Sequence, residues 1–133
     1  MTATETQHIA PTEQQVKALV AAAQDAALLV VIINLLAFND QVGGTSYERY
    51  VQEVAPHLQR VGAQVIYAGN SAQVVIGGRD RPWWDAIVVV QYSSRAKFLE
   101  MVLDPDYQNI AVHRSAALET CGVISTDPWQ VEN

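Results

Sequence analysis

The sequence contains little charge, a single cysteine and no apolar run long enough to cross a membrane. Of its 133 residues, 17% are charged and 50% are hydrophobic, a balance that favours a single domain with a buried interface. Cys121 has no second cysteine for an internal disulfide. The apolar run 26–38 is shorter than the roughly 20 residues of a membrane span, and the N-terminus lacks the pattern of a signal peptide. We therefore expect a cytoplasmic protein with no membrane partner.

Clusters of positive charge and the usual cofactor motifs are missing too. Eight Lys and Arg residues are scattered among fourteen Asp and Glu residues, for a formal net charge of −6, so nucleic acid is not an expected partner. The sequence has neither a glycine-rich phosphate loop nor a Gly-x-Ser-x-Gly elbow. Three dispersed histidines and one cysteine lack the spacing of metal ligands. We predict no metal and no cofactor, although His57 and His113 are the axial ligands that a haem would have.

Residues 28–38 form the most apolar stretch, in which Asn34 is the one polar side chain. A strand exposed on one face alternates apolar and polar residues, whereas a strand covered on both faces is apolar throughout. This stretch therefore predicts a strand in the middle of a sheet. One layer of helices covers one face of such a sheet, and we expect a second copy of the chain to cover the other.

Capping residues, apolar spacing and runs of Val, Ile and Tyr predict the remaining elements. The predicted helices are residues 13–24 after the capping-box residue Thr12, a helix from the capping-box residue Thr45 to Gly62 with a bend at Pro56, and a helix capped by Ser93 or Ser94 that restarts at Asp104 and Pro105. The predicted strands are residues 63–76, with a bend or bulge at 69–71, residues 85–92 and residues 118–125.

Without the leading helix, the predicted order is strand, helix, strand, strand, helix, strand. This order consists of two halves, each a strand, a helix and a strand. Together the two halves form a ferredoxin-like α+β domain, with a four-stranded antiparallel sheet and helices on one face. We expect a flexible leader at 1–11, a single domain at 12–126 and a C-terminal tail at 127–133. The bare face of the sheet then pairs with a second subunit as a homodimeric barrel.

Several segments together resemble one family. They are residues 33–38 (Ile-Asn-Leu-Leu-Ala-Phe), 47–50 (Tyr-Glu-Arg-Tyr) with 54–56 (Val-Ala-Pro), 84–88 (Trp-Asp-Ala-Ile-Val), 94–101 (Ser-Arg-Ala-Lys-Phe-Leu-Glu-Met) and 104–107 (Asp-Pro-Asp-Tyr) running on to 113–119 (His-Arg-Ser-Ala-Ala-Leu-Glu). This combination, over about residues 11–125, is similar to the family called domain of unknown function 1330. The chain departs from it at 116–119, where relatives usually have Ala-Gly-Leu-Glu.

The resemblance implies membership of the dimeric α+β barrel superfamily. Members of that superfamily include cofactor-free monooxygenases acting on polyketide-type phenols, lactone isomerases, polyketide cyclases and haem-using enzymes. Their common property is a small, often aromatic molecule held between sheet and helices. A shared fold does not settle a function, so the residues themselves have to indicate the site.

Two residues are candidates for acid–base catalysis. The ordinary pKa of a histidine suits proton transfer near neutral pH, and His113 lies near the end of the last predicted helix. A histidine at that place also stabilises the helix dipole. Asp85 opens a strand and offers a carboxylate at a pocket mouth. It could equally be solvated or paired with Arg79, Arg81 or Arg95.

Six residues are candidates for substrate binding. A buried Asn34 must bond either a ligand or a neighbouring strand. The connector rich in Arg and Trp suits an anionic aromatic ligand, and it equally suits a subunit interface. Tyrosine hydroxyls bond either a ligand or the backbone. The candidates are Asn34, Trp84, Arg79, Tyr50, Tyr107 and Arg114.

These observations favour a homodimeric barrel that binds a small apolar or aromatic, polyketide-like molecule. Acid–base catalysis without a cofactor, of the isomerase, cyclase, dehydratase or monooxygenase type, is the leading hypothesis. The alternative is a non-catalytic binding or accessory protein with the same cavity.

Overall fold

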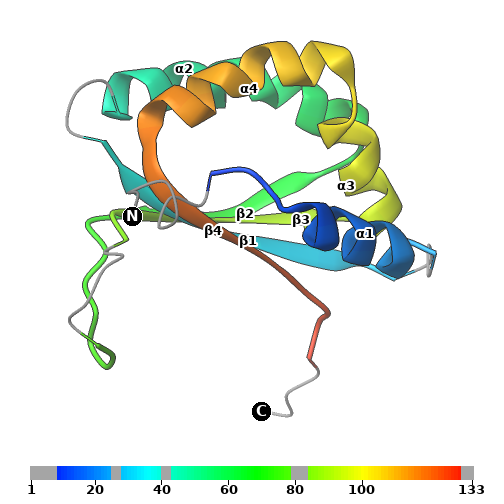
Figure 1. The fold of residues 1–133 in the computed structure, drawn as a ribbon, viewed down its shortest axis with the longest axis horizontal. Coiled ribbons are helices and arrows are strands. Elements are labelled where there is room, and N and C mark those ends of the chain that lie inside the picture. Colours follow the sequence, from blue (N-terminus) through cyan, green and yellow to red (C-terminus); the bar gives the residue numbers. More distant parts are fainter. Residues whose placement is uncertain (1–8, 25–27, 40–42, 79–83, 130–133) are drawn as a thin grey trace.

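A computed structural model describes residues 9–24, 28–39, 43–78 and 84–129 (Figure 1). It has the expected α+β, ferredoxin-like architecture, in which a four-stranded antiparallel sheet lies beneath a layer of helices. In chain order the elements are α1 (Glu13–Ala22), β1 (Val30–Phe38), α2 (Gly43–Arg60), β2 (Gln64–Asn70), β3 (Ala86–Tyr92), α3 (Arg95–Val102), α4 (Pro105–Ala117) and β4 (Leu118–Thr126).

The strand order is β2-β3-β1-β4, so β1 lies inside the sheet between β3 and β4, as its apolar sequence predicts. Its side chains alternate between the two faces. Val30, Ile32 and Leu36 are buried against the helices. Val31, Ile33 and Leu35 point to the opposite face and remain partly exposed. The helices therefore cover one face only, which we call the helix side, and leave the other, the open face.

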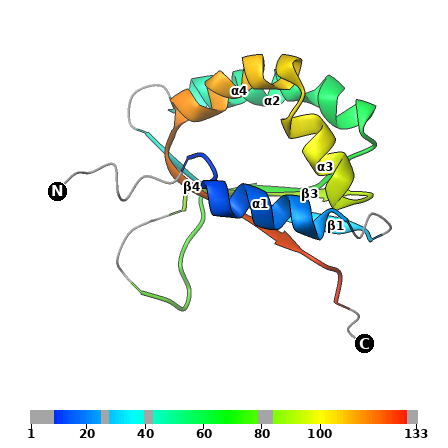
Figure 2. The same cartoon turned by 45° about the vertical axis from the view of Figure 1, so that its right-hand side comes forward.

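The helix side is covered mainly by α2 and α4, with α3 continuing the layer (Figure 2). Tyr50 and Val54 of α2 and Met101 of α3 join Ile32 and Val90 of the sheet in one core cluster. A second cluster surrounds Leu36 of β1. By contrast, α1 has no buried residue and contacts α3 from the side.

Most of the predicted helix starts are confirmed. The capping box of Thr12 is formed in both directions, and the hydroxyl of Ser94 accepts a hydrogen bond from Lys97 N at 3.2 Å. Asp104 caps α4, where Asp106 N donates to Oδ1 at 2.7 Å. That backbone hydrogen bond stabilises the carboxylate and lowers the pKa of Asp104.

Two predicted boundaries were wrong. Helix α2 begins at Gly43 and not at Thr45, so the capping-box spacing at Thr45 lies inside the helix. Strand β2 ends at Asn70 and not at residue 76, and its irregularity lies between Val65 and Tyr67. Asn70 pairs with Ala86, the first residue of β3. Beyond that pair the ladder ends. Ser71 has a φ of 56°, and one more hydrogen bond, from Ala72 N to Asp85 O at 3.2 Å, holds the chain before it leaves the sheet.

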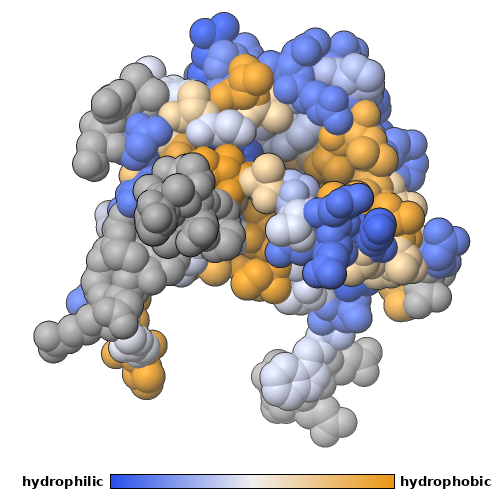
Figure 3. Space-filling view, viewed as in Figure 1, coloured by the Kyte–Doolittle hydropathy of each residue, from blue (hydrophilic) through white to orange (hydrophobic). Residues whose placement is uncertain are grey.

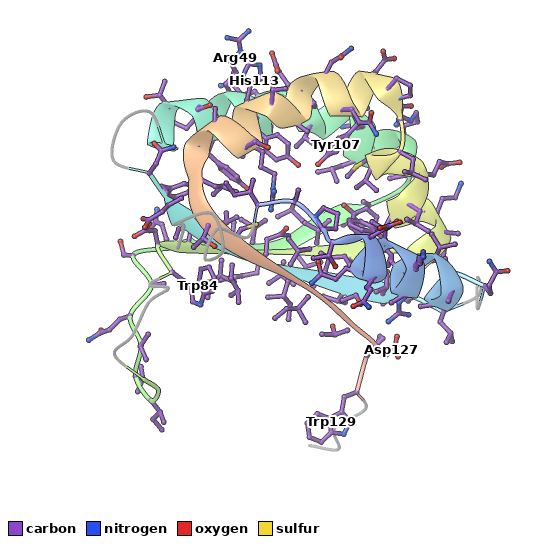
Figure 4. All side chains as sticks on the ribbon, viewed as in Figure 1. Arg49, Trp84, Tyr107, His113, Asp127 and Trp129 are labelled. Atoms are coloured by element: carbon purple, nitrogen blue, oxygen red, sulfur yellow. The ribbon has the colours of Figure 1, made fainter. Side chains whose placement is uncertain are left out.

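Two segments project from the body on the side of the open face (Figures 1 and 4). One is the loop at 71–78, in which Val75 and Ile76 are 87% and 95% exposed. Figure 3 shows hydrophobic side chains at the lower tip of this loop. The other is the chain after β4, where Asp127 Oδ1 pairs with Arg95 Nη1 at 2.9 Å and Trp129 is 87% exposed. Both segments carry large apolar side chains into solvent.

Among the described residues, none of the helices has the length and apolar character needed to cross a bilayer.

Candidate functional site

A groove of about 470 Å³ opens on the helix side, between α2 and the β2–β3 edge of the sheet. Side chains alternate between the two faces along each strand. On the helix side, Ala68 and Asn70 of β2 and their partners Val88 and Ala86 of β3 point toward the groove. Its wall is mostly apolar, with one carboxylate at the mouth. The lining residues are Phe38, Tyr47, Glu48, Val51, Gln52, Ala68, Gly69, Asn70, Ala86 and Val88.

Aromatic rings lead from this groove into the protein. The ring centroids of Phe38 and Tyr47 are 5.3 Å apart, and those of Tyr47 and Tyr50 are 5.4 Å apart. The hydroxyls of Tyr50 and Tyr107 then lie 2.9 Å from each other in a hydrogen bond between α2 and α4. Tyr47 therefore belongs both to the groove and to a set of buried phenols.

Arg114, in the last turn of α4, lies beside a core cluster against which Phe38 and Tyr47 pack. One of its nitrogens, Nη2, donates to Cys121 Sγ on β4 at 3.4 Å. In the described part of the chain, no carboxylate lies within the 4.0 Å ion-pair distance of its guanidinium. A partly buried guanidinium whose hydrogen-bonding partner is a thiol is poorly compensated, because sulfur is a weak acceptor.

Burial raises the pKa of three phenols, those of Tyr47, Tyr50 and Tyr92. Desolvation raises the pKa of Tyr47 to about 12, and the nearby charge of Arg114 acts in the opposite direction. Desolvation also raises the pKa of Tyr50 and of Tyr92. At neutral pH these side chains are therefore hydrogen-bond donors and not bases.

The raised pKa predicts a loss of stability in alkali. The folded pKa of Tyr47 lies above its ordinary value of 10.0, so its contribution is complete below pH 10 and is lost as the pH rises through about 12. We expect the fold to lose on the order of 2 kcal/mol from Tyr47 over that range. Urea titrations at several pH values measure this loss.

Tyr47→Phe is the control for that experiment, because it keeps the ring and removes the titrating hydroxyl. The variant should show a flatter fall in stability between pH 10 and pH 12 than the parent protein. An equally steep fall in both would contradict the assignment to Tyr47.

His113 lies on the outer side of the helix layer, beside Arg49 (Figure 4). Its Nε2 is 3.3 Å from Glu53 Oε2, while Glu53 Oε1 accepts a hydrogen bond from Arg49 Nε at 3.4 Å. The groove wall does not include His113. The structure thus places this candidate base in a charged cluster between α2 and α4.

Asp85 is exposed, just before β3, and is not part of the groove wall, although its neighbours Phe38 and Ala86 are. Its Oδ2 accepts a hydrogen bond from Phe38 N at 2.8 Å, and its own N–H donates to Leu36 O at 2.7 Å. Of the arginines considered as its partner, Arg95 pairs with Asp127 instead. Arg79 and Arg81 lie outside the described residues.

Trp84 lies on the open face, below the sheet (Figure 4), where a Cβ at Gly122 would meet its ring at 3.7 Å. Asn34 is on the helix side of β1, and its Nδ2 donates to Val88 O at 3.1 Å. Of the two expected roles of Asn34, the structure therefore shows the hydrogen bond to a neighbouring strand.

The candidates that the structure brings together are Tyr50, Tyr107 and Arg114, which lie behind Tyr47 and are not part of the groove wall themselves. Sequence reasoning missed Tyr47 and Glu48 as groove residues. Tyr47 stands three positions before Tyr50, a spacing that puts both rings on one face of a helix. This spacing could have identified Tyr47 from the sequence. In the part of the chain that the structure describes, no group of three acidic, histidine or cysteine side chains is arranged to hold a metal ion.

Comparisons with known proteins agree with this fold. The RPA0582 protein of Rhodopseudomonas palustris, described as a protein of unknown function, has 28% identity and a TM-score of 0.83, over 94% of this chain and 99% of its own. A hydroxynitrile lyase from Passiflora edulis has 13% identity and a TM-score of 0.62, over 80% of this chain and 99% of its own.

A dimeric ferredoxin-like protein of unknown function from Thermobifida fusca has 14% identity and a TM-score of 0.53, over 77% of this chain and 92% of its own. At these low identities, the lyase and the dimeric protein indicate the fold alone. A search of curated proteins found no match. Residues 31–126 match the family described as a domain of unknown function, DUF1330, and this chain belongs to that family.

Proposed function

We propose that this chain is a homodimeric protein that binds a small apolar or aromatic molecule in the groove and performs acid–base chemistry on it without a cofactor. Isomerisation, cyclisation, dehydration and an oxygenation in which the substrate activates oxygen all suit its side chains. The observation that carries the proposal is the double role of Tyr47, which lines the groove and packs against the buried phenols.

The chemistry would divide between two adjacent residues of α2. Tyr47 stays protonated, so its hydroxyl donates a hydrogen bond to a carbonyl oxygen and stabilises the negative charge that develops there. The positive charge of Arg114 adds to that stabilisation. Glu48 lines the same groove and offers the carboxylate that takes a proton from the neighbouring carbon.

A small enolisable ketone, 2-tetralone, tests both roles without knowledge of the natural substrate. We expect the protein to bind it and to speed deuterium incorporation next to its carbonyl, as measured by NMR. Tyr47→Phe should weaken binding about three- to tenfold, the effect of one lost neutral hydrogen bond. Glu48→Gln should retain binding and lose the acceleration.

Tyr67→Phe is the matched control, because Tyr67 lies on the open face and is 61% exposed. Loss of binding in this control, or no effect of Tyr47→Phe, would contradict the proposed site. Binding without any acceleration would favour the second candidate, a non-catalytic binding protein. The positions of His113 and Asp85 outside the groove support that second candidate.

The proposed homodimer would bury the open face. This face carries Ile33 and Leu35 of β1, Val89 of β3 and Ile124 of β4, which are partly or largely exposed in one copy. The loop at 71–78 and the tail with Trp129 extend on the same side, so a second copy seated there would also contact their apolar side chains. The dimeric assembly named for the Thermobifida fusca protein supports this arrangement.

A further inference from the structure

We propose that Arg114 binds the carboxylate of a small aromatic acid, an inference that rests on the proposed function and names its ligand class. A guanidinium presents five donors in a planar fork that matches a carboxylate in two parallel hydrogen bonds. The described residues supply Arg114 with one acceptor, Cys121 Sγ at 3.4 Å. Most of its donors are therefore left for a ligand.

The groups around Arg114 do not neutralise it. Its partner Cys121 belongs to a core cluster against which Tyr47 packs, and the ring of Tyr47 packs in turn on Tyr50. Both hydroxyls are neutral donors at pH 7. Glu53 pairs with Arg49 and His113 on the outer side of the helices. The immediate surroundings of Arg114 therefore favour an anion even though the whole chain is acidic.

The chemistry of the site points to a carboxylate and not to a phosphate. Among the described residues, Arg114 is the one guanidinium that bonds a side chain of the cluster against which Phe38 and Tyr47 pack, and a single guanidinium balances the single charge of a carboxylate. The neighbouring rings of Phe38, Tyr47 and Tyr50 offer stacking and edge contacts to an aromatic ring. Glu48 at the groove mouth repels an anion, so the carboxylate end would point inward, toward Arg114.

Benzoate and its neutral isostere benzamide test this proposal. Isothermal titration at pH 7 should show benzoate binding at least about tenfold more tightly than benzamide. Arg114→Gln should abolish that preference, whereas Arg114→Lys should retain part of it, because Lys keeps the charge but not the fork. Arg49→Gln is the control, since Arg49 is exposed on the outer side and pairs with Glu53.

A measurement on the unaltered protein guards against variants that do not fold. In protein labelled with ¹⁵N at arginine, benzoate should shift the Arg114 Nε–H resonance and leave that of Arg49 in place. Equal affinity for benzoate and benzamide, or no shift at Arg114, would overturn the proposal.

The outcome also separates this inference from the proposed function. Binding of 2-tetralone that depends on Tyr47, together with no preference for benzoate, would leave the groove function standing and remove the anion site. A benzoate preference that depends on Arg114, with 2-tetralone binding unaffected by Tyr47→Phe, would leave the anion site standing and remove the proposed groove function.

Discussion

Leu36→Ala should destabilise the fold by about 2–5 kcal/mol, the range for truncating a fully buried leucine. Leu36 is 0% exposed, on the helix side of β1, and packs in a cluster with Ala86, Leu118 and Cys121. Because β1 is inside the sheet, both neighbouring strands hold its backbone in place and limit the collapse that would fill the cavity. Urea unfolding at a fixed protein concentration measures the change.

Leu103→Ala is the matched control for this substitution. Leu103 is the same residue type at the end of α3 and is 61% exposed. The control should change stability by no more than about 0.5 kcal/mol. Similar losses in the two variants would show that Leu36 is not held in a rigid core.

Ile124→Lys should weaken the proposed dimer by on the order of a hundredfold, or about 2.7 kcal/mol. Ile124 faces the open side of the sheet opposite Ile33 and is 48% exposed in one copy. A lysine there keeps its charge in water while the chain is a monomer. In the dimer, each copy would place an ammonium group in an apolar interface, where an unpaired charge is costly.

Sedimentation velocity over a range of concentrations measures this effect. The parent protein should sediment as a dimer and Ile124→Lys as a folded monomer. Val112→Lys, at a 57% exposed position on α4, is the control and should remain dimeric. A monomeric parent protein, or two lysine variants that dissociate alike, would contradict the assignment of the open face.

The fold was predictable because its strongest signals are local. The apolar run before Asn39 predicted the inner strand, and the caps at Thr12, Ser94 and Asp104 predicted three of the helix starts. Each of these signals acts within a few residues of the position that it specifies. The structure confirms them with small shifts in length.

The boundaries that were wrong depend on pairing between distant segments. Residues 71–76 have the composition of a strand, yet β2 stops at Asn70 because its partner β3 begins at Ala86. Local composition does not reveal where a partner strand begins. The start of α2 at Gly43 is a similar case, since glycine opposes a helix in isolation.

The candidate site was only partly predictable for the same reason. Tyr50, Tyr107 and Arg114 were selected by residue type, and the packing of α2 on α4 brought them together. His113 is adjacent to Arg114 in sequence, but a rotation of about 100° per residue around the helix directs it to the outer side. The choice between neighbours therefore depended on the phase of α4 relative to the sheet, which the weak apolar stripe of that helix does not define.

The inner position of β1 has a consequence for synthesis on the ribosome. Both strands that pair with Val30–Phe38 are encoded later, at Ala86–Tyr92 and Leu118–Thr126, whereas β2, which follows first, is not its neighbour. At typical elongation rates the first partner emerges on the order of 2 to 10 s after β1. During that interval the most apolar segment has no strand to pair with, so the nascent chain depends on α2 or on a chaperone to shield it.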